Sequence, residues 1–475
     1  MKKSLYIFFA ALLMLTACTK DLEELNIDPK NPSTAPSYAL FTNGQRALAN
    51  TVTSSNINLN IFRVLVQHMQ TTQYPEESNY DIGNRTVNDN LWDAFYRDAL
   101  RDLEEAKNII PTDVPDPAVQ QNQLAIVDIM QIYAWYYLVT TFGDIPYTQA
   151  LDVDQPFPVY DDANTIYTDL LTRLDAAIAN LNPGAASFGG ADLIYNGNIP
   201  AWLKFANSLK LKMGMTIADS DPAKAKSVVE AAVAAGVFTS NADNALLNYQ
   251  GAPPNTNPIW VDLVQSGRDD YVANSTIINM LEARNDPRLD DYFTTDQVGG
   301  YSGGDPGANS TYAQLSHLNP TITEPDFPAD LLDYAEVELH LAEAVERGFN
   351  VGGTAQSHYN AGVTASIIFW GGTAADATAY LAQPNVNYAT ASANYKEKIG
   401  VQKYLSLFNR GMDVWIEWRR LDYPQLQPAV DAVSGFPVRF PYPVNEQNVN
   451  RANFEAASTA IGGDVVETKL WWDVF

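Results

Sequence analysis

Residues 118–142 read AVQQNQLAIVDIMQIYAWYYLVTTF, a long and strongly apolar segment. Its candidates for burial are Ile126, Ile129, Tyr133, Tyr136 and Tyr137. Upstream of it, apolar residues recur at three- and four-residue steps from Trp92 to Ile110, which is the spacing of one face of an amphipathic helix. We therefore predict a mainly helical protein with this segment in its interior.

Three further helices follow, each with a recognisable start or stop. Asp161-Asp162 opens a helix that ends at Asn182-Pro183-Gly184, Pro200 starts a second, and Asp221-Pro222 starts a third that ends at Gly236. Helices joined by short loops favour antiparallel pairs. Their stacking resembles tetratricopeptide helix pairs, although the roughly 34-residue repeat of that class does not align along the chain.

The composition changes from about Ala242 to Pro328, where Gly, Pro, Asn, Asp and Tyr are dense and only Ser275 to Arg284 looks helical. Long loop-rich stretches in compact proteins are usually functional or mobile, so we predict that 242–328 is a loop-rich insertion in the helical scaffold. Further helices are predicted at Leu331–Arg347, Ala355–Trp370, Ala374–Leu381, Tyr388–Phe408 and Met412–Leu421, followed by an irregular tail with a short hairpin from Gln425 to Phe475.

The amino-terminal residues have the form of a lipoprotein signal peptide. Lys2 and Lys3 precede an apolar run from Leu5 to Leu15, which is shorter than the roughly 20 residues of a membrane span. The run leads into Cys18, the only cysteine of the chain. We predict a signal peptide at 1–17, acylation of Cys18 by fatty acids such as palmitate, and a lipidated tether at 18–36. A buried core cysteine is the alternative interpretation.

The charge of the chain excludes one class of partner. Lys and Arg number 29 against 56 Asp and Glu, which gives a formal net charge of −27. Such a surface repels nucleic acid, and no basic stripe in the sequence compensates for it. Charged residues are only 18% of the chain and aromatic residues are 11%, a composition that favours a large core, in one unit or two intimate ones, over a disordered acidic tail.

The sequence contains no convincing catalytic, metal or cofactor motif. Gly300 to Gly304 matches the Gly-x-Ser-x-Gly pattern of hydrolases, but that motif needs a helix after the serine and Asp305-Pro306-Gly307 follows instead. Asp152-Val153-Asp154 lacks the other ligands of a calcium loop. The histidines show no metal-ligand spacing and no phosphate-binding loop appears; the histidines are His68, His317, His340 and His358. We predict no enzyme, cofactor or metal, although a catalytic carboxylate pair stays open.

Aromatic residues outside the helical stripes are the candidates for a ligand site. Sugars present flat apolar faces between hydroxyl groups, so rings beside Asn, Asp and Arg suit them, and an apolar pocket with a few polar groups serves peptides as well. The predicted ligand-binding residues are Tyr74, Asn79, Tyr80, Trp260, Arg268, Asp269, Tyr271 and Tyr301. The alternative for each ring is burial that holds its loop in place.

For three tryptophans and two arginines we predict structural roles rather than ligand binding. Trp92, Trp202 and Trp415 lie in helical stripes and are predicted to be core residues. Arg419 and Arg420 could clamp an anionic ligand, but in so acidic a protein we favour pairing with carboxylates.

Several motifs together resemble the SusD/RagB family of outer-membrane nutrient-binding lipoproteins, particularly its SusD-like branch. Asn26 to Pro32 after the acylation motif looks like the start of the family, and Phe142 to Tyr147 is similar to its "FGDVPY" segment. The acidic residues after Cys18 resemble the export signal of Bacteroidetes surface lipoproteins, a solvated linker being the simpler interpretation. Further segments resemble family signatures in the family's order, namely 202–211, 334–344, 402–420 and 439–446.

The resemblance implies a tetratricopeptide-like helix-pair scaffold with an irregular, loop-rich ligand-binding portion and minor β structure, forming a SusD-like domain over 37–475. It also implies a lid that captures glycans or peptides and delivers them to a SusC-like TonB-dependent transporter. We therefore predict a non-catalytic binding lipoprotein, anchored in the outer membrane and exposed at the cell surface. The alternatives are a surface-anchored hydrolase with an unrecognised carboxylate pair and a structural or adhesive protein.

Overall fold

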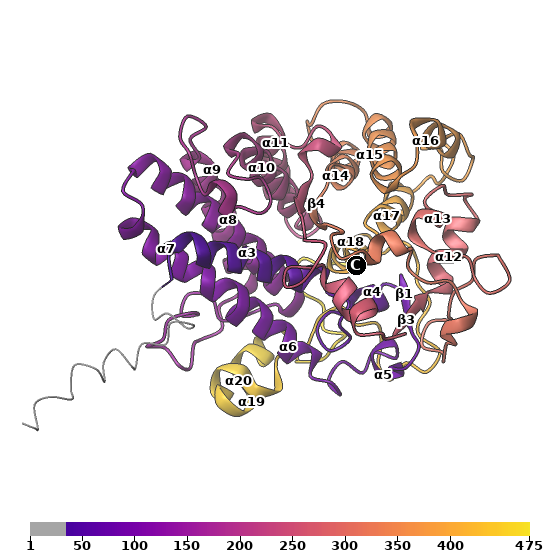
Figure 1. The fold of residues 1–475 in the computed structure, drawn as a ribbon, viewed down its shortest axis with the longest axis horizontal. Coiled ribbons are helices and arrows are strands. Elements are labelled where there is room, and N and C mark those ends of the chain that lie inside the picture. Colours follow the sequence, from indigo (N-terminus) through magenta and orange to yellow (C-terminus); the bar gives the residue numbers. More distant parts are fainter. Residues whose placement is uncertain (1–34) are drawn as a thin grey trace, which may run out of the picture.

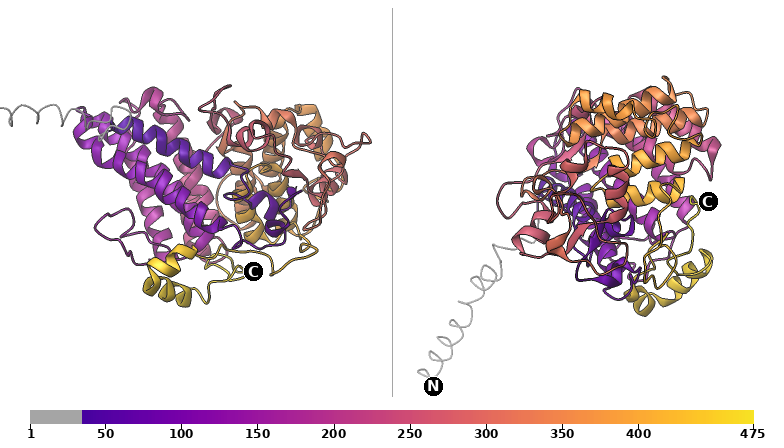
Figure 2. Two further views of the ribbon diagram at one scale, coloured as in Figure 1. Left: turned by 60° about the horizontal axis from the view of Figure 1, so that its bottom comes forward. Right: turned by 90° about the vertical axis from the view of Figure 1, so that its right-hand side faces the viewer.

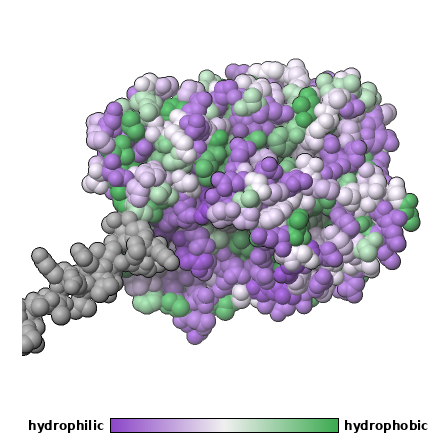
Figure 3. Space-filling model, viewed as in Figure 1, coloured by the Kyte–Doolittle hydropathy of each residue, from purple (hydrophilic) through white to green (hydrophobic). Residues whose placement is uncertain are grey.

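The computed structural model describes residues 35–475. The predictions for the signal peptide, for Cys18 and for the tether up to residue 34 therefore lie outside the described residues. The described chain is mainly helical and has four short strands, which confirms the predicted fold class (Figure 1). The face in Figure 3 is largely hydrophilic, with apolar residues scattered over it.

The amino-terminal half is a set of packed helices. These are α3 (Ser37–Thr53), α6 (Val87–Asp93), α7 (Arg101–Asp113), α8 (Pro117–Phe142), α9 (Ala163–Asn180), α10 (Ile199–Thr216) and α11 (Pro222–Ala235). Neighbours in sequence pack against each other in the pairs α7–α8, α8–α9 and α10–α11, and α3 packs against α7. The left view of Figure 2 shows these helices on one side of the molecule and the later helices drawn in orange on the other.

Polar side chains start these helices where the sequence predicted. Asp162 accepts a hydrogen bond from the Thr165 backbone at the start of α9, and Asp221 does the same for Lys224 at the start of α11. The predicted helix over Trp92 to Ile110 runs through a π-helical turn, η1 (Ala94–Leu100), before α7 begins.

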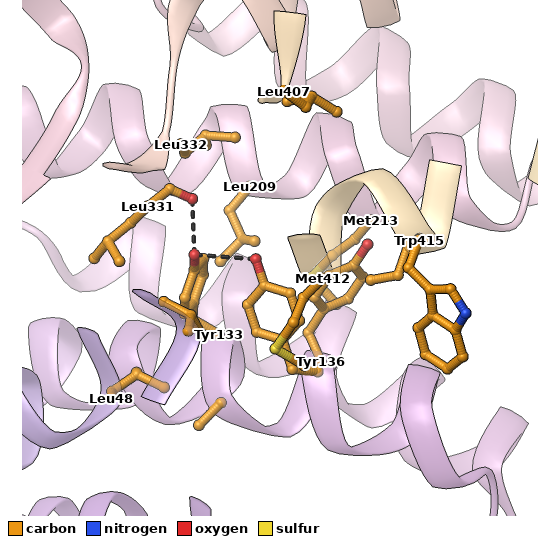
Figure 4. Packing of buried hydrophobic residues seen from close by; sticks show 14 of the residues in the cluster. Leu48, Tyr133, Tyr136, Leu209, Met213, Leu331, Leu332, Leu407, Met412 and Trp415 are labelled. Carbon is orange, nitrogen blue, oxygen red and sulfur yellow. Dashed lines mark hydrogen bonds between the residues drawn. The ribbon is translucent and has the colours of Figure 1, made fainter. Parts of the chain in front are cut away.

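Helix α8 is the centre of the core. It is long and apolar enough to cross a membrane, but 89% of its most apolar window is buried inside the protein. Tyr133 is fully buried, and its hydroxyl donates a 2.7 Å hydrogen bond to the Leu331 carbonyl (Figure 4). The buried phenol thus keeps a partner and joins α8 to a strand far away in the sequence.

The carboxy-terminal helices are α14 (Tyr334–Glu346), α15 (Ala355–Trp370), α16 (Ala374–Leu381), α17 (Tyr395–Ser406) and α18 (Gly411–Leu421). Two predicted helix starts were wrong. Leu331 and Leu332 belong to strand β4 (Ala329–Leu332), which pairs antiparallel with β2 (Ala245–Leu247), and α14 starts only after its cap Asp333. Helix α17 starts after Asn394, whose side chain accepts from the Lys396 backbone, rather than at Tyr388.

The tail also differs from the prediction. It contains two helices, α19 (Val444–Val449) and α20 (Arg451–Ala460), in place of a hairpin. Residues 451–460 are rich in Ala, with Arg and Glu, which favour helix over strand. The prolines around Phe440 misled the sequence-based prediction by suggesting an irregular chain throughout.

Residues 242–328 contain short elements only. Strand β3 (Tyr271–Ala273) pairs antiparallel with β1 (Met69–Thr71), which brings this stretch against the chain that follows α3. Its other elements are η3 (Asn241–Asp243), the π-helical turn η4 (Trp260–Gln265), α12 (Ser275–Glu282), α13 (Leu289–Tyr292), η5 (Tyr312–Gln314) and η6 (Pro320–Thr323). Outside it lie α4 (Phe62–Leu65), α5 (Pro75–Ser78) and η2 (Gly189–Ala191).

Buried ion pairs join helices in the interior. Lys212 of α10 contacts Glu336 of α14 at 2.9 Å and also contacts Asp413 of α18. Lys403 of α17 contacts Glu343 at 2.9 Å and Glu417 at 2.6 Å. All six of these side chains are almost completely buried, so each charge depends on its partners for the interactions that water would otherwise provide.

The two adjacent arginines, Arg419 and Arg420, have different partners in the structure. Arg420 pairs with Glu343 and Glu417, as predicted. Arg419 forms no such pair with any residue in 35–475. Its guanidinium donates to the backbone carbonyls of Thr140 and Val438 at 3.0 and 2.7 Å. The prediction was wrong for Arg419 because backbone acceptors are invisible in a sequence. Three tryptophans are core residues as predicted, namely Trp92, Trp202 and Trp415.

Candidate ligand-binding site

A cavity of about 220 Å³ lies where the loop-rich stretch meets strand β1. Two predicted ligand residues, Arg268 and Tyr271, line it. We call this cavity and the adjoining Tyr74 the loop site. Its walls also include Met69, Leu263, Val264, Asp270, Thr294, Tyr312, His317, Leu318, Pro320 and Thr323.

Tyr74 lies next to two guanidinium groups at the edge of the loop site. The guanidinium carbon of Arg85 is 4.6 Å from the centre of the Tyr74 ring, and that of Arg268 is 5.4 Å away. Arg268 also donates to the Tyr74 hydroxyl. Cations over a phenol ring are attracted by its quadrupole, so the three side chains hold one another in place.

Each of these arginines is paired with a buried carboxylate. Arg85 Nε is 2.8 Å from Glu77 Oε1, and Arg268 Nε is 2.8 Å from Asp270 Oδ2. Burial raises the pKa of the Glu77 carboxyl to about 7. Burial also raises the pKa of Asp270. The net charge beside Tyr74 therefore changes close to neutral pH.

A second aromatic surface comes from residues that the sequence did not single out for ligand binding. The rings of Tyr312 and His317 stack with their centres 3.8 Å apart, and His317 Nε2 lies 2.7 Å from the Tyr312 carbonyl. Both rings are partly exposed and line the cavity. Tyr312 could have been found by the criterion that selected Tyr301, an aromatic ring in the loop-rich stretch. His317 was considered only as a metal ligand.

Two predicted residues are buried and bonded to backbone. The Tyr271 hydroxyl donates to the Ser55 carbonyl at 2.7 Å, and the Tyr80 hydroxyl accepts from the Ala429 backbone at 3.0 Å. Both side chains hold distant parts of the chain together. Tyr271 still contributes to the wall of the cavity, whereas Tyr80 does not line it.

The remaining predicted residues do not line the cavity. Trp260 is partly exposed at the start of η4, whose Leu263 and Val264 do line the cavity. Asp269 is exposed, and its carbonyl accepts from the Thr72 hydroxyl. Asn79 faces Gly307, and Tyr301 packs against the core in the glycine-rich loop.

At the other candidate motifs, the described side chains are engaged in contacts with one another. Ser302 lies in irregular chain and donates a 2.8 Å hydrogen bond to Asp296, without the strand and helix of a nucleophile elbow. His340, Glu343 and Glu417 are close enough together to hold a metal ion, but the Lys403 ammonium already contacts all three at 2.6–2.9 Å.

Most of the chain matches a known family. A sequence model described as "Starch-binding associating with outer membrane" and belonging to the SusD-like group matches residues 29–443. The chain belongs to the SusD-like family. No curated protein matches this SusD-like chain.

Solved structures agree with this membership. The SusD-like protein is similar to a chitin-binding protein, with 28% identity, a TM-score of 0.81 and coverage of 92% of this chain and 100% of that one. A chitin-binding SusD homologue from Flavobacterium johnsoniae has 25% identity and a TM-score of 0.80, with 91% and 98% of the two chains covered. A SusD homologue from Bacteroides uniformis has 28% identity and a TM-score of 0.79, with 92% and 100% covered.

Proposed function

We propose that this SusD-like protein binds glycans at the surface of the outer membrane, through the loop site, and passes them to a TonB-dependent transporter of the SusC type. The observation that carries the proposal is the match of residues 29–443 to a family described as starch-binding and associated with the outer membrane. The names of two similar structures add chitin as a ligand to try first.

The geometry of the loop site supports a sugar ligand. Tyr312 and His317 offer a flat stacked surface, and Tyr74 lies beside two guanidinium groups that can donate to hydroxyl oxygens. Asp270 lines the same cavity and supplies an acceptor. An oligopeptide is the second candidate ligand, because the same walls provide apolar contacts and charged groups.

Binding of maltoheptaose and chitohexaose by calorimetry tests the proposal. We expect Tyr74→Ala and Arg268→Ala each to raise Kd about tenfold, since residues at a binding centre contribute more than about 1 kcal/mol. Arg451→Ala, an exposed arginine paired with Glu455 on α20, is the control and should leave Kd unchanged. Equal Kd values for all three variants would remove the loop site from the proposal, and release of shorter sugars would favour a hydrolase.

Delivery to a transporter needs a separate measurement. Protein tagged at its carboxyl terminus and extracted from its own outer membrane in mild detergent should copurify with a large β-barrel protein. Recovery of the protein alone would favour a structural or adhesive role over delivery.

A further inference from the structure

A larger cavity lies outside the loop site, along helix α3. Its volume is about 810 Å³, within the range of roughly 300–1,000 Å³ typical of ligand pockets, whereas the loop cavity of about 220 Å³ falls below it. We call it the α3 groove. Its walls come from α3, from residues around η2 and from the end of β2 with the loop that follows.

One face of α3 forms a long wall of the groove. Tyr38, Thr42 and Arg46 are spaced four residues apart, so they lie in a row along the helix. Tyr38 is 55% exposed, which leaves a phenol ring available to a ligand. Opposite the row lie apolar side chains, among them Phe188, whose ring stacks on buried Phe41 at 3.8 Å.

The polar side chains of the groove carry amides, hydroxyl groups and one guanidinium. Asn248 and Gln250 are exposed on its rim, and the described residues that line it include no Asp or Glu, although the chain has 56 of them. Arg46 donates to the side-chain oxygens of Asn43 and Asn255 and forms no ion pair within residues 35–475. These groups can both donate to and accept from hydroxyl groups without carrying negative charge.

A buried amide also favours a ligand with hydroxyl groups. Gln123 of α8 lines the groove and is 7% exposed, and its Oε1 has no hydrogen-bond partner among the described residues. A buried polar atom without a partner costs free energy, which a ligand hydroxyl or an ordered water at the groove would recover.

The groove continues past Arg46. A cavity of about 540 Å³ shares Asn43 and Arg46 with it and extends along α3 to Asn50, Ser54 and Pro258. Arg46 thus lies at the junction of two cavities that follow one helix. A linear chain of several sugar units fits this arrangement better than a compact molecule does.

We infer that the α3 groove is a second glycan-binding site, for an uncharged oligosaccharide, and that it acts beside the loop site. The inference rests on the proposed glycan-binding function. Tyr38 stacks on a sugar face, Arg46 and the rim amides bind hydroxyl groups, and the net charge of −27 disfavours polyanionic sugars. A second site on the same chain would hold a long glycan at two points and lower the rate at which the glycan dissociates.

Calorimetry with maltoheptaose and chitohexaose on variants of each site tests the inference. The unaltered protein should bind two oligosaccharides per chain. Tyr38→Ala, which removes an exposed ring, should weaken one of the two sites about tenfold, and Ala39→Trp should abolish it by filling the groove. Ala231→Trp on the exposed face of α11 is the matched control. Arg268→Ala should affect the other site alone.

The outcomes separate the two claims. One bound oligosaccharide, unaffected by Tyr38→Ala and Ala39→Trp, overturns the groove while the proposed function stands. No binding of any glycan overturns the proposed function itself. Tighter binding of oligogalacturonate than of the neutral sugars in the groove overturns the assignment of an uncharged ligand.

Discussion

His68 lies in the turn directly before β1, and its completely buried side chain faces helix α17. Its ring meets Tyr404 edge-on at 4.5 Å and Phe408 at 5.4 Å, and Nε2 lies 3.1 Å from the Tyr404 carbonyl. Burial lowers the pKa of His68 to about 3. The native protein therefore keeps this imidazole neutral at pH values where an unfolded chain protonates it.

The consequence is a loss of stability in acid. Between pH 6.5 and about 3 the unfolded chain binds a proton at His68 that the native state does not, so the free energy of unfolding falls as pH falls, by at most about 1.4 kcal/mol per pH unit. Above pH 6.5 this effect is absent. We expect His68→Phe, which keeps the ring contacts, to lessen the loss, as measured by urea unfolding from pH 7 to pH 4. Parallel curves for the two proteins would contradict this explanation.

At the same scale, sequence reasoning reached part of the loop site. Arg268 and Tyr271 were predicted from their residue types, and both line the cavity. Arg85 and Asp270 were missed because their role depends on a neighbour, Tyr74 or Arg268, that only the fold brings close. Which rings are exposed and which are bonded to backbone, as Tyr80 is, follows from tertiary contacts that no local pattern records.

At the scale of elements, the close contact of α3 and α7 depends on a glycine. A Cβ added to Gly44 would lie 2.8 Å from Leu103 Cγ and 3.1 Å from the Ala99 carbonyl. Both distances are shorter than an ordinary van der Waals contact, so the Leu103 side chain and the backbone at Ala99 must shift to admit even a methyl group.

We expect Gly44→Ala to destabilise the protein by about 1–3 kcal/mol, despite the gain of about 1 kcal/mol that Ala brings inside a helix. Thermal or urea unfolding measures the change. Gly83→Ala is the control, because a Cβ at Gly83 meets no atom within 4 Å. A more stable Gly44→Ala variant would show that the packing of α3 on α7 is looser than described.

The helices were predictable where local signals agreed. Asp221 caps α11 and Gly236 ends it with a φ of 106°, as the Asp-Pro start and the glycine stop indicated. Strand β4 was not predictable, because Leu331 and Leu332 extend an apolar helical pattern and become a strand only by pairing with β2. Local sequence signals were thus enough to predict the helices, whereas the short strands depend on the segments with which they pair.

At the scale of the whole molecule, we predict that a lipid anchor on Cys18 holds the protein in the membrane. We expect Cys18→Ala to shift the protein from the membrane fraction to the soluble fraction of its cells, because the acyl chains that supply membrane affinity are missing. Immunoblots of the two fractions measure this shift. Mass spectrometry of the unaltered protein should find fatty acids on Cys18, and an unmodified, freely soluble protein would contradict the anchor.

The buried ion pairs have a consequence for how the chain reaches its native state. Helix α14 places Glu336 and Glu343 in the interior, and their cations arrive from Lys212, earlier in the chain, and from Lys403, near its end. Until α17 and α18 are present, Glu343 has only the Arg347 guanidinium beside it and lacks Lys403 and Arg420, so a partly synthesised chain pays a desolvation penalty for compacting around α14. Folding that waits for the last helices keeps the polypeptide unfolded for longer, which would suit the export that the predicted signal peptide implies.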